Sequence, residues 1–156
     1  MIDYALENKE AIDNTIVMDL FCGTGTIGQI LASRSTNAKI IGVDIVDSAI
    51  KDAIKNAERN NIDGLQFYTA DVGKFLTEHP EYKNNIRTII LDPSRAGIAP
   101  KTLLKIININ ADRIVYVSCN PATQARDTEN MINHGYELKK ISLVDQFPHT
   151  LSLIHI

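Results

Sequence analysis

The sequence predicts an α/β fold: a mostly parallel, doubly wound sheet that ends in an antiparallel C-terminal hairpin. Apolar runs rich in Ile and Val alternate with helical patterns along almost the whole chain, which is typical of repeated strand–helix–strand units. The runs are nearly continuous in apolar residues, as in strands buried on both faces of a sheet. Near the C-terminus, two strand-like runs follow each other with no helix between them, which predicts the hairpin.

The predicted parallel strands are short apolar runs. They are Thr15–Leu20, Lys39–Val43, Leu65–Thr69, Thr88–Leu91 and Arg113–Val117. The predicted helices between them are Thr26–Ser33, Asp47–Asn61, Val72–Glu78, Lys101–Ile107 and Pro121–Asn133; in the second, Ile50, Ile54 and Ala57 recur at helical spacing. The hairpin strands are Tyr136–Val144 and Leu151–Ile156, with one strand antiparallel to the rest. Met1–Asp13 is expected to form a short helix before the sheet.

Length and composition indicate a single domain over residues 1–156, and we expect a monomer. The chain has 156 residues, 44% of them hydrophobic and 22% charged, which is ordinary for a globular domain. No apolar run approaches the roughly 20 residues of a membrane helix. The N-terminus lacks a signal-peptide pattern, so we expect a cytoplasmic protein with no membrane partner. Two cysteines are too few for a disulfide framework or a Cys-rich metal site, and no metal is predicted.

A glycine-rich turn after the first strand predicts a nucleotide-like ligand. The segment reads Asp-Leu-Phe-Cys-Gly-Thr-Gly-Thr-Ile-Gly from residue 19 to residue 28. Gly23 and Gly25 let the backbone turn tightly and approach a ligand beside Phe21, and the following helix points its N-terminal amides there. Dinucleotide-binding folds use such turns as well. Asp19 just before the turn suits a cationic sulfonium and repels a pyrophosphate, which favours S-adenosyl-L-methionine as the cofactor.

Two further carboxylates follow successive strands. Asp44 closes the second strand, 19 residues after Gly25, where a carboxylate can accept hydrogen bonds from both ribose hydroxyls. Asp71 closes the third strand and is a candidate partner for the adenine amine. Either residue alone could be an ordinary polar strand end, but ligands in open α/β sheets bind at these carboxyl ends. We interpret Cys22, within the turn, as a small packing residue rather than a nucleophile.

The fourth and fifth strands deliver two chemically suggestive segments to the same edge of the sheet. The fourth strand runs into Asp92-Pro-Ser-Arg95-Ala-Gly, and the fifth into Ser-Cys119-Asn-Pro121-Ala-Thr. Pro121 fits the first helical position with Asn120 as its cap. A thiol just before a helix favours its thiolate form and is able to add to an electrophilic carbon. The alternative is that Cys119 is a buried, inert cysteine.

These segments together resemble the catalytic domain of the RNA 5-methyluridine (uracil-C5) methyltransferases, with the Rossmann-like class I fold. The resemblance covers Val17 to Thr150. It is carried by DLFCGTGTIG, GVDIVDSAIKDAIKNAERNNI, DPSRAGI, YVSCNPATQARD and VDQFPHT, of which the last three, in this order and spacing, are specific. Ser94 stands where the family often has a second proline, which is a mild departure. The class I methyltransferase fold also ends in an antiparallel hairpin.

The resemblance implies methylation of uridine in tRNA or rRNA. Cys119 would add to uracil C6, C5 would then attack the methyl group of S-adenosyl-L-methionine, and a base would remove the C5 proton. The family places Asp92 beside the cofactor and the reacting base, and Arg95 is a candidate for binding phosphate or the uracil carbonyl region. The target nucleotide would have to leave its stack, and Phe147 would either support stacking or belong to the core. Because the net charge is −3, RNA would need a local basic surface or a further domain.

The resemblance stops after Thr150. The family continues with a His and then a Glu that removes the C5 proton, but Ser152 and Ile154 stand at those positions, and an isoleucine cannot take a proton. The last six residues, Leu-Ser-Leu-Ile-His-Ile, match one translation frame of a common transposon-end sequencing adapter. We therefore expect 151–156 to be a non-native tail on a truncated catalytic domain; the alternative is a diverged paralogue that lost its base.

Two other functions remain open from the residues. One is a class I methyltransferase acting on cytosine C5 or on an amine, although amine-directed enzymes usually place two prolines and an aromatic residue after the fourth strand, where Ser94 and Arg95 stand here. The other is a non-catalytic module that binds S-adenosyl-L-methionine or RNA, which the missing base would permit.

Overall fold

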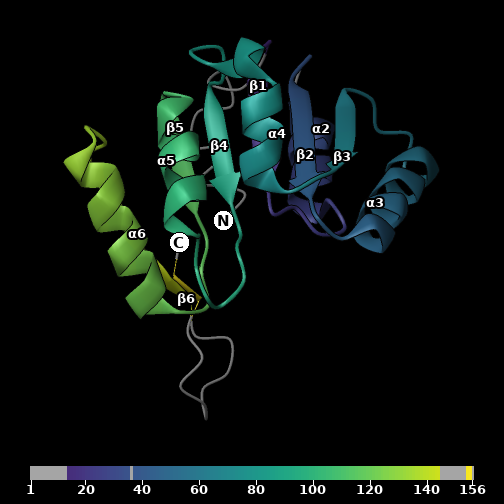
Figure 1. Ribbon diagram of the computed structural model, residues 1–156. Helices are drawn as coiled ribbons and strands as arrows, with labels where there is room; N and C mark the ends of the chain where they lie inside the picture. Colours follow the sequence, from purple (N-terminus) through teal and green to yellow (C-terminus); the bar gives the residue numbers. More distant parts are fainter. Residues whose placement is uncertain (1–13, 36, 145–153, 156) are drawn as a thin grey trace.

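The computed structural model describes residues 14–35, 37–144 and 154–155, and a five-stranded parallel sheet forms its centre (Figure 1). The strands are β1 (Ile16–Leu20), β2 (Lys39–Asp44), β3 (Leu65–Thr69), β4 (Thr88–Leu91) and β5 (Arg113–Tyr116). Their order is β3-β2-β1-β4-β5, and every neighbouring pair is parallel. All five predicted parallel strands are confirmed, and the chain order reverses between β1 and β4.

Helices cover both faces of this sheet. They are α2 (Thr26–Arg34), α3 (Asp47–Arg59), α4 (Val72–Glu78), α5 (Pro100–Asn108) and α6 (Pro121–Asn133), with a short 3-10 turn, η2 (Pro80–Tyr82), after α4. One apolar core lies between the sheet and α4 with α5, and a smaller one lies between the sheet and α2. In Figure 1, α4 and α5 cross in front of the strands and α2 lies behind them. The predicted doubly wound architecture is confirmed.

Successive strand residues explain the two cores. Side chains alternate between the faces of a strand, so Met18 joins the larger core while Val17 joins the smaller one. Ile41 and Ile40 on β2 divide in the same way. All four side chains are fully buried. A strand that must fill both cores needs apolar residues at consecutive positions, which is why these strands read as continuous runs and not as alternating ones.

The C-terminal hairpin is confirmed as an antiparallel pair, but it is shorter than predicted. β6 (Leu143–Val144) pairs with β7 (Ile154–His155) in a separate two-stranded sheet. The prediction of a strand from Tyr136 is wrong, because residues 136–142 form no strand. Leu138 and Ile141 are 48% and 66% exposed there, so no buried apolar face stabilises an extended pairing.

Some predictions concern residues that the structure does not describe. The expected helix at Met1–Asp13 lies outside the described residues. So do the residues from Asp145 to Leu153, which include Phe147 and Ser152. Within the described ranges, no helix is long and apolar enough to cross a membrane.

Candidate cofactor and catalytic site

The turn after β1 has a strained backbone. Phe21, Gly23 and Gly25 all have positive φ angles, of 63°, 53° and 69°. An aromatic residue rarely adopts this left-handed region, and such strain persists where the surroundings fix it, often at functional sites. Here the backbone amides of Phe21 and Cys22 both donate to the carbonyl oxygen of Val43, at 2.9 and 3.2 Å. The end of β2 therefore fixes the turn in the place where the sequence predicts a cofactor.

Phe67 on β3 packs against the same turn. A Cβ atom added at Gly25 would lie 2.6 Å from the Phe67 ring, and one added at Gly42 on β2 would lie 2.5 Å from it. The ring therefore occupies space that only glycines leave open. Phe67 was not predictable from the sequence, because nothing in its own strand marks it as a neighbour of residues 25 and 42.

Asp19 is a buried carboxylate with one unused oxygen. Its side chain is 1% exposed, and Oδ2 accepts a hydrogen bond from the Gly28 amide at 3.0 Å. Oδ1 is buried and has no hydrogen-bond partner among the described residues. The pKa of Asp19 is raised to about 7, mainly by burial and in part by the charges of Asp92 and Asp44, while the hydrogen bond from the Gly28 amide opposes the rise. A ligand with a positive charge or a hydrogen-bond donor fits this oxygen.

Asp44 is held in a defined orientation at the end of β2. Its Oδ2 accepts from the Gly23 amide at 2.8 Å, and its Oδ1 accepts from the Val46 amide at 2.9 Å. Each carboxylate oxygen keeps a further acceptor site, so a pair of hydroxyl groups fits here as well. A Cβ atom added at Gly23 would meet nothing within 4 Å, so this side of the turn is open. The structure thus brings Asp19, Gly23 and Asp44 together, as the sequence predicted.

Asp71 follows β3, the strand next to β2, and the amide of Ala70 just before it donates to the Asp44 carbonyl oxygen at 2.8 Å. Asp71 is exposed, and its Oδ1 caps α4 by accepting from the Lys74 amide at 2.8 Å. The assignment of Asp71 to an adenine amine stays a prediction.

Cys22 is half-buried within the turn. Desolvation raises the pKa of the Cys22 thiol, and the neighbouring charges of Asp19 and Asp44 raise it further. A thiol that resists ionisation is a poor nucleophile. This environment agrees with the packing role that we inferred for Cys22.

Asp92 lies where the strand order reverses. It follows β4, its amide donates to the Leu20 carbonyl oxygen of β1 at 3.4 Å, and partial desolvation raises the pKa of its carboxyl group. Ligands of open α/β sheets bind outside the carboxyl ends of the strands at such a reversal. Asp19, Asp44 and Asp92 place three carboxyl groups at this end of the sheet, which suits a cation and disfavours a pyrophosphate.

Cys119 lies on the surface between β5 and α6. It is exposed, so the alternative of a buried, inert cysteine is wrong. Ser118 and Asn120 on either side exchange two hydrogen bonds, at 3.0 and 3.1 Å, and Asn120 Oδ1 caps α6 by accepting from the Ala122 amide at 3.1 Å. Pro121 occupies the first helical turn. The predicted cap is confirmed, and it fixes the backbone on both sides of the thiol.

The loop after β4 is hydrogen-bonded to the residues that follow Cys119. Asn120 Nδ2 donates to the Arg95 carbonyl oxygen at 3.0 Å, and Thr123 Oγ1 donates to the same oxygen at 3.4 Å. β4 and β5 are parallel neighbours, so both segments leave the same edge of the sheet. The structure therefore brings the loop that carries Asp92 and Arg95 against the turn that carries Cys119. Sequence analysis assigned Asn120 only to the helix cap and missed this link.

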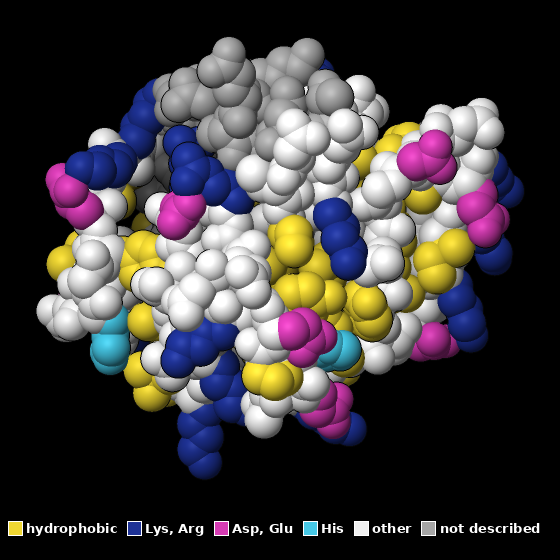
Figure 2. Space-filling model, turned by 90° about the horizontal axis from the view of Figure 1, so that it is seen from above, with side chains coloured by type: hydrophobic (Ala, Val, Ile, Leu, Met, Phe, Trp, Pro, Cys, Tyr) yellow, Lys and Arg dark blue, Asp and Glu magenta, His cyan; other side chains and the backbone are white. Residues whose placement is uncertain are grey.

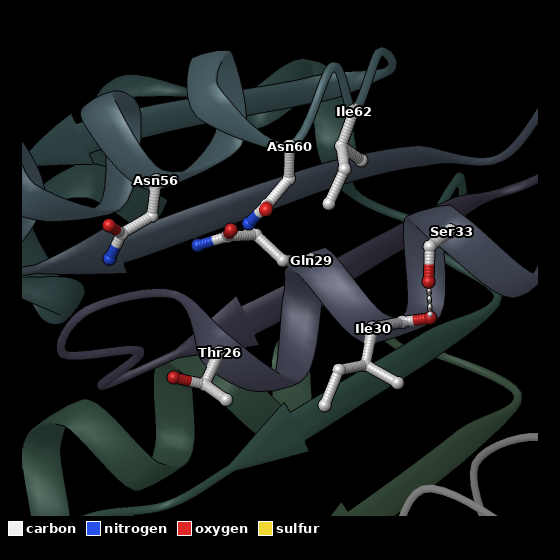
Figure 3. Close-up of a pocket in the computed structure, with 7 residues that line it drawn as sticks. All are labelled: Thr26, Gln29, Ile30, Ser33, Asn56, Asn60 and Ile62. Carbon is white, nitrogen blue, oxygen red and sulfur yellow. Dashed lines mark hydrogen bonds between the residues drawn. The ribbon is translucent and has the colours of Figure 1, made fainter.

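A depression between α2 and α3 lies outside this site (Figure 3). Its volume is about 260 Å³, and it is lined by Thr26, Gln29, Ile30, Ser33, Asn56, Asn60 and Ile62. None of these side chains carries a charge, and none is a predicted site residue. The depression offers nothing that would favour a cationic ligand over water.

The family described as "Methyltransferase domain" matches residues 12–151. The chain belongs to this methyltransferase domain family. An "Uncharacterized RNA methyltransferase" of Clostridium acetobutylicum is 44% identical over 145 residues, which are 93% of this chain and 31% of that protein. The 23S rRNA (uracil(1939)-C(5))-methyltransferase RlmD of Haemophilus influenzae is 39% identical over 150 residues, which are 96% of this chain and 34% of that protein.

A solved structure agrees with the fold of this methyltransferase domain. The Pyrococcus abyssi tRNA (uracil-54, C5)-methyltransferase, in complex with S-adenosyl-L-homocysteine, superposes with a TM-score of 0.80 at 33% identity and covers 98% of this chain and 36% of that one. The predicted Rossmann-like methyltransferase fold is confirmed. The chain spans about a third of the length of the curated relatives that it matches.

Proposed function

We propose that this methyltransferase domain transfers the methyl group of S-adenosyl-L-methionine to C5 of uridine in tRNA or rRNA, with Cys119 as the nucleophile. The observation that carries the proposal is the exposed Cys119 thiol on a capped turn, fastened through Asn120 to the loop of Asp92 and Arg95. The names of the Haemophilus and Pyrococcus relatives support uracil C5 as the target.

The residues of the β1 turn fit S-adenosyl-L-methionine. This cofactor supplies a methyl group on a positively charged sulfur and also carries an amino group. The unused buried oxygen of Asp19 and the nearby carboxylates of Asp44 and Asp92 favour such a cation. Asp44 would accept from the ribose hydroxyls beside Gly23, and Asp71 would receive the adenine amine. Phe21 and Gly25 shape the turn that the cofactor would touch.

The proposed chemistry of Cys119 is the one that the family resemblance implies. Its thiolate would add to C6 of uracil, and the C5–C6 electron pair would move toward the C4 carbonyl as an enolate. C5 would then take up the methyl group, whose bonding electron pair stays on the cofactor sulfur. Removal of the C5 proton by a base returns electrons to the ring and expels the thiolate. Arg95 would hold the phosphate or the uracil carbonyl region, and Asp92 would lie beside the base. The target nucleotide must be unstacked to reach Cys119.

The last step needs a base that accepts the C5 proton. We infer that the methylated adduct persists, because Ile154 stands where the resembling family has its proton-abstracting Glu. An alkyl side chain has no lone pair with which to accept the C5 proton.

RNA binding needs a surface beyond the three carboxylates Asp19, Asp44 and Asp92. Figure 2 shows Lys and Arg side chains interspersed with Asp and Glu on the face at the amino ends of the strands, and no large single-sign area among its described residues. A phosphate chain is held by basic side chains, so this face offers it little. We propose that RNA approaches from the opposite, carboxyl-end side, where Arg95 is exposed.

The test uses two RNA substrates and two cysteine variants. The chain is incubated with S-adenosyl-L-methionine and either unmodified tRNA and rRNA transcripts or the same transcripts made with 5-fluorouridine. Fluorine on C5 cannot leave as a proton does, so a methylated adduct that forms on this RNA persists. Denaturing gels and mass spectrometry measure the protein–RNA adduct, with Cys119→Ala as the test variant and Cys22→Ala as the matched control.

We expect the adduct with both RNAs, its loss in Cys119→Ala and its retention in Cys22→Ala. An adduct that survives in Cys119→Ala, or failure to bind S-adenosyl-L-methionine in a calorimetric titration, would refute the proposed function. Persistence on 5-fluorouridine RNA alone, with turnover on ordinary RNA, would show that another group supplies the base.

A further inference from the structure

A second set of contacts joins α6 to the loop after β4. Asp127 on α6 is 1% exposed. Its Oδ2 accepts from the Ile98 amide at 2.9 Å and from the Tyr116 hydroxyl at 2.7 Å. Its Oδ1 accepts from Arg126 Nε at 2.8 Å and lies 2.7 Å from Arg126 Nη2. Hydrogen bonds to this one carboxylate on α6 therefore connect the loop after β4 and the last residue of β5 to the helix.

The loop is shaped for this close approach. Gly97 has a φ angle of 76°, and a Cβ atom added there would lie 2.9 Å from Asp127 Oδ2 and 2.7 Å from Arg126 Nη2. Only glycine leaves room for the carboxylate at this point while also adopting the left-handed backbone. Arg126 Nη2 also donates to the Ile98 carbonyl oxygen at 3.2 Å. Both backbone groups of Ile98 are therefore held by adjacent residues of α6.

Two residues that follow Cys119 in the chain hold this loop. Asn120 donates to the Arg95 carbonyl oxygen, and Asp127 accepts from the Ile98 amide. The Tyr116 hydroxyl, on β5 before Cys119, donates to the same Asp127 oxygen and orients the carboxylate. The backbone from Arg95 to Ile98 cannot shift relative to the Cys119 turn without breaking one of these bonds.

We propose that Asp127 is a positioning residue, which holds the loop of Asp92 and Arg95 against the Cys119 turn through Ile98 and Tyr116. The inference rests on the proposed function and adds to it the residue that sets the geometry of its two catalytic segments. Asp127 does not touch the reacting base. It acts through the backbone of the loop, and a displacement of about 1 Å between reacting groups is enough to cost roughly a hundredfold in rate.

The effect on chemistry is separable from the effect on cofactor binding. The hydrogen bonds of Asp127 lie on β5, α6 and the loop after β4, whereas Asp19 and Asp44 lie at the ends of β1 and β2. Asp92, which the resemblance places beside the cofactor, is held independently of Asp127, because its amide donates to the Leu20 carbonyl oxygen of β1 at 3.4 Å. Loss of the Asp127 contacts should therefore slow the formation of the Cys119 adduct and leave the affinity for S-adenosyl-L-methionine intact. A residue needed only for stability would lower both together.

The experiment compares Asp127→Asn and Tyr116→Phe with the control Asp112→Asn. Asparagine keeps the shape of the side chain and removes its charge, and Tyr116→Phe is a milder change that removes one donated hydrogen bond. Asp112 forms an exposed ion pair with Arg87, away from the loop. We measure the rate of adduct formation on 5-fluorouridine RNA, the dissociation constant for S-adenosyl-L-methionine, and amide hydrogen exchange in residues 94–98.

In Asp127→Asn we expect adduct formation to slow about 10- to 100-fold, with the dissociation constant within about twofold of the original. Tyr116→Phe should show a smaller effect in the same direction, and exchange in residues 94–98 should quicken in both variants. Asp112→Asn should change none of the three. A parallel loss of adduct formation and cofactor affinity, or no change in either, would overturn the positioning role.

If the original chain forms no adduct at all, the proposed function fails, and the role of Asp127 is decided by two measurements that need no RNA. These are hydrogen exchange in residues 94–98 and the rate at which iodoacetamide alkylates Cys119. A change in both for Asp127→Asn supports the contact between loop and turn. Unchanged values refute it.

Discussion

Two carboxylates in the described part of the chain are almost completely buried, and their surroundings are opposite. Asp127 and Asp19 are each 1% exposed. Both oxygens of Asp127 accept hydrogen bonds, and Arg126 lies beside it. Asp19 has one amide partner, one oxygen with none, and like charges nearby. Burial of a charge is tolerated where hydrogen-bond partners replace water, so the surroundings of Asp127 indicate a structural role.

Asp19 gains only partial compensation from the protein, through the Gly28 amide. The rise of its pKa to about 7 reflects the cost of a buried charge that the described residues do not offset. A group that costs stability and persists at the predicted cofactor turn is explained by a ligand that supplies the missing partner. The contrast separates a structural carboxylate from a binding carboxylate by their partners, since their burial is the same.

Removal of the Asp127 side chain should have the largest effect on stability. Asp127→Ala leaves the Tyr116 hydroxyl and the Ile98 amide without their acceptor and leaves Arg126 without its counter-charge. We expect a loss of about 3 kcal/mol in the free energy of unfolding, at the low end for a buried ion pair because Arg126 is half exposed and regains water. Urea denaturation at pH 7 measures it. A loss below about 1 kcal/mol would contradict a structural role for this carboxylate.

Substitution of Asp19 should have the opposite sign. In Asp19→Asn the side-chain oxygen still accepts from Gly28, and the buried charge is gone. Because the folded-state pKa of about 7 lies above the ordinary 3.8, the folded state holds the proton more tightly. The wild-type chain therefore loses stability as pH rises from about 4 to 7. We expect Asp19→Asn to be more stable than wild type by about 1–4 kcal/mol at pH 8, and by almost nothing at pH 4.

Urea denaturation at pH 4.5 and pH 8 tests this sign. Asp127→Asn is the matched comparison, since it makes the same chemical change at equal burial but removes a satisfied acceptor. A lower stability for both variants at pH 8 would mean that the two carboxylates do not differ in the way that their partners indicate.

The sequence predicted one of these carboxylates and missed the other. Asp19 directly precedes a glycine-rich turn, so its place in the fold follows from local spacing. Asp127 follows Arg126 in a helix, where such a pair usually faces solvent. Its burial arises from Tyr116 and Ile98, which lie 11 and 29 residues away in the chain. A contact of this kind depends on the packing of α6 against β5, which no local pattern encodes.

The same limit explains the other differences. The parallel strands were predictable because a strand buried on both faces must be apolar at every position, a property of the strand alone. The ring of Phe67 beside Gly25 and Gly42 depends on the register between β2 and β3. The wrongly predicted strand from Tyr136 had apolar residues, such as Leu138, that the fold leaves exposed.

The pH dependence of cofactor binding should distinguish Asp19 from Asp127, with an expected effect of intermediate size. The proposed cofactor is a cation, which favours the ionised form of Asp19, so its affinity should rise with pH until the pKa of about 7 is passed. We expect the dissociation constant for S-adenosyl-L-methionine to be about tenfold weaker at pH 6 than at pH 8, by calorimetric titration. In Asp19→Asn the affinity should be lower and nearly independent of pH. A wild-type affinity that falls with rising pH would exclude a cation beside this carboxylate.

Removal of an exposed ion pair should have the smallest effect on the free energy of unfolding. Comparison with Asp127 then shows how much of the stabilisation by Asp127 depends on its burial. Asp112 pairs with Arg87, and the two side chains are 59% and 47% exposed. Water and salt screen such a pair, so Asp112→Asn should cost no more than about 1 kcal/mol in the free energy of unfolding. The cost should shrink further in 0.5 M NaCl, because screening weakens exposed pairs most. Asp127→Asn should keep its cost at the same salt concentration, since its partners are hydrogen bonds inside the protein. If salt removed both costs alike, Asp127 would act as a surface charge, and its place beside Ile98 and Tyr116 would not account for its effect.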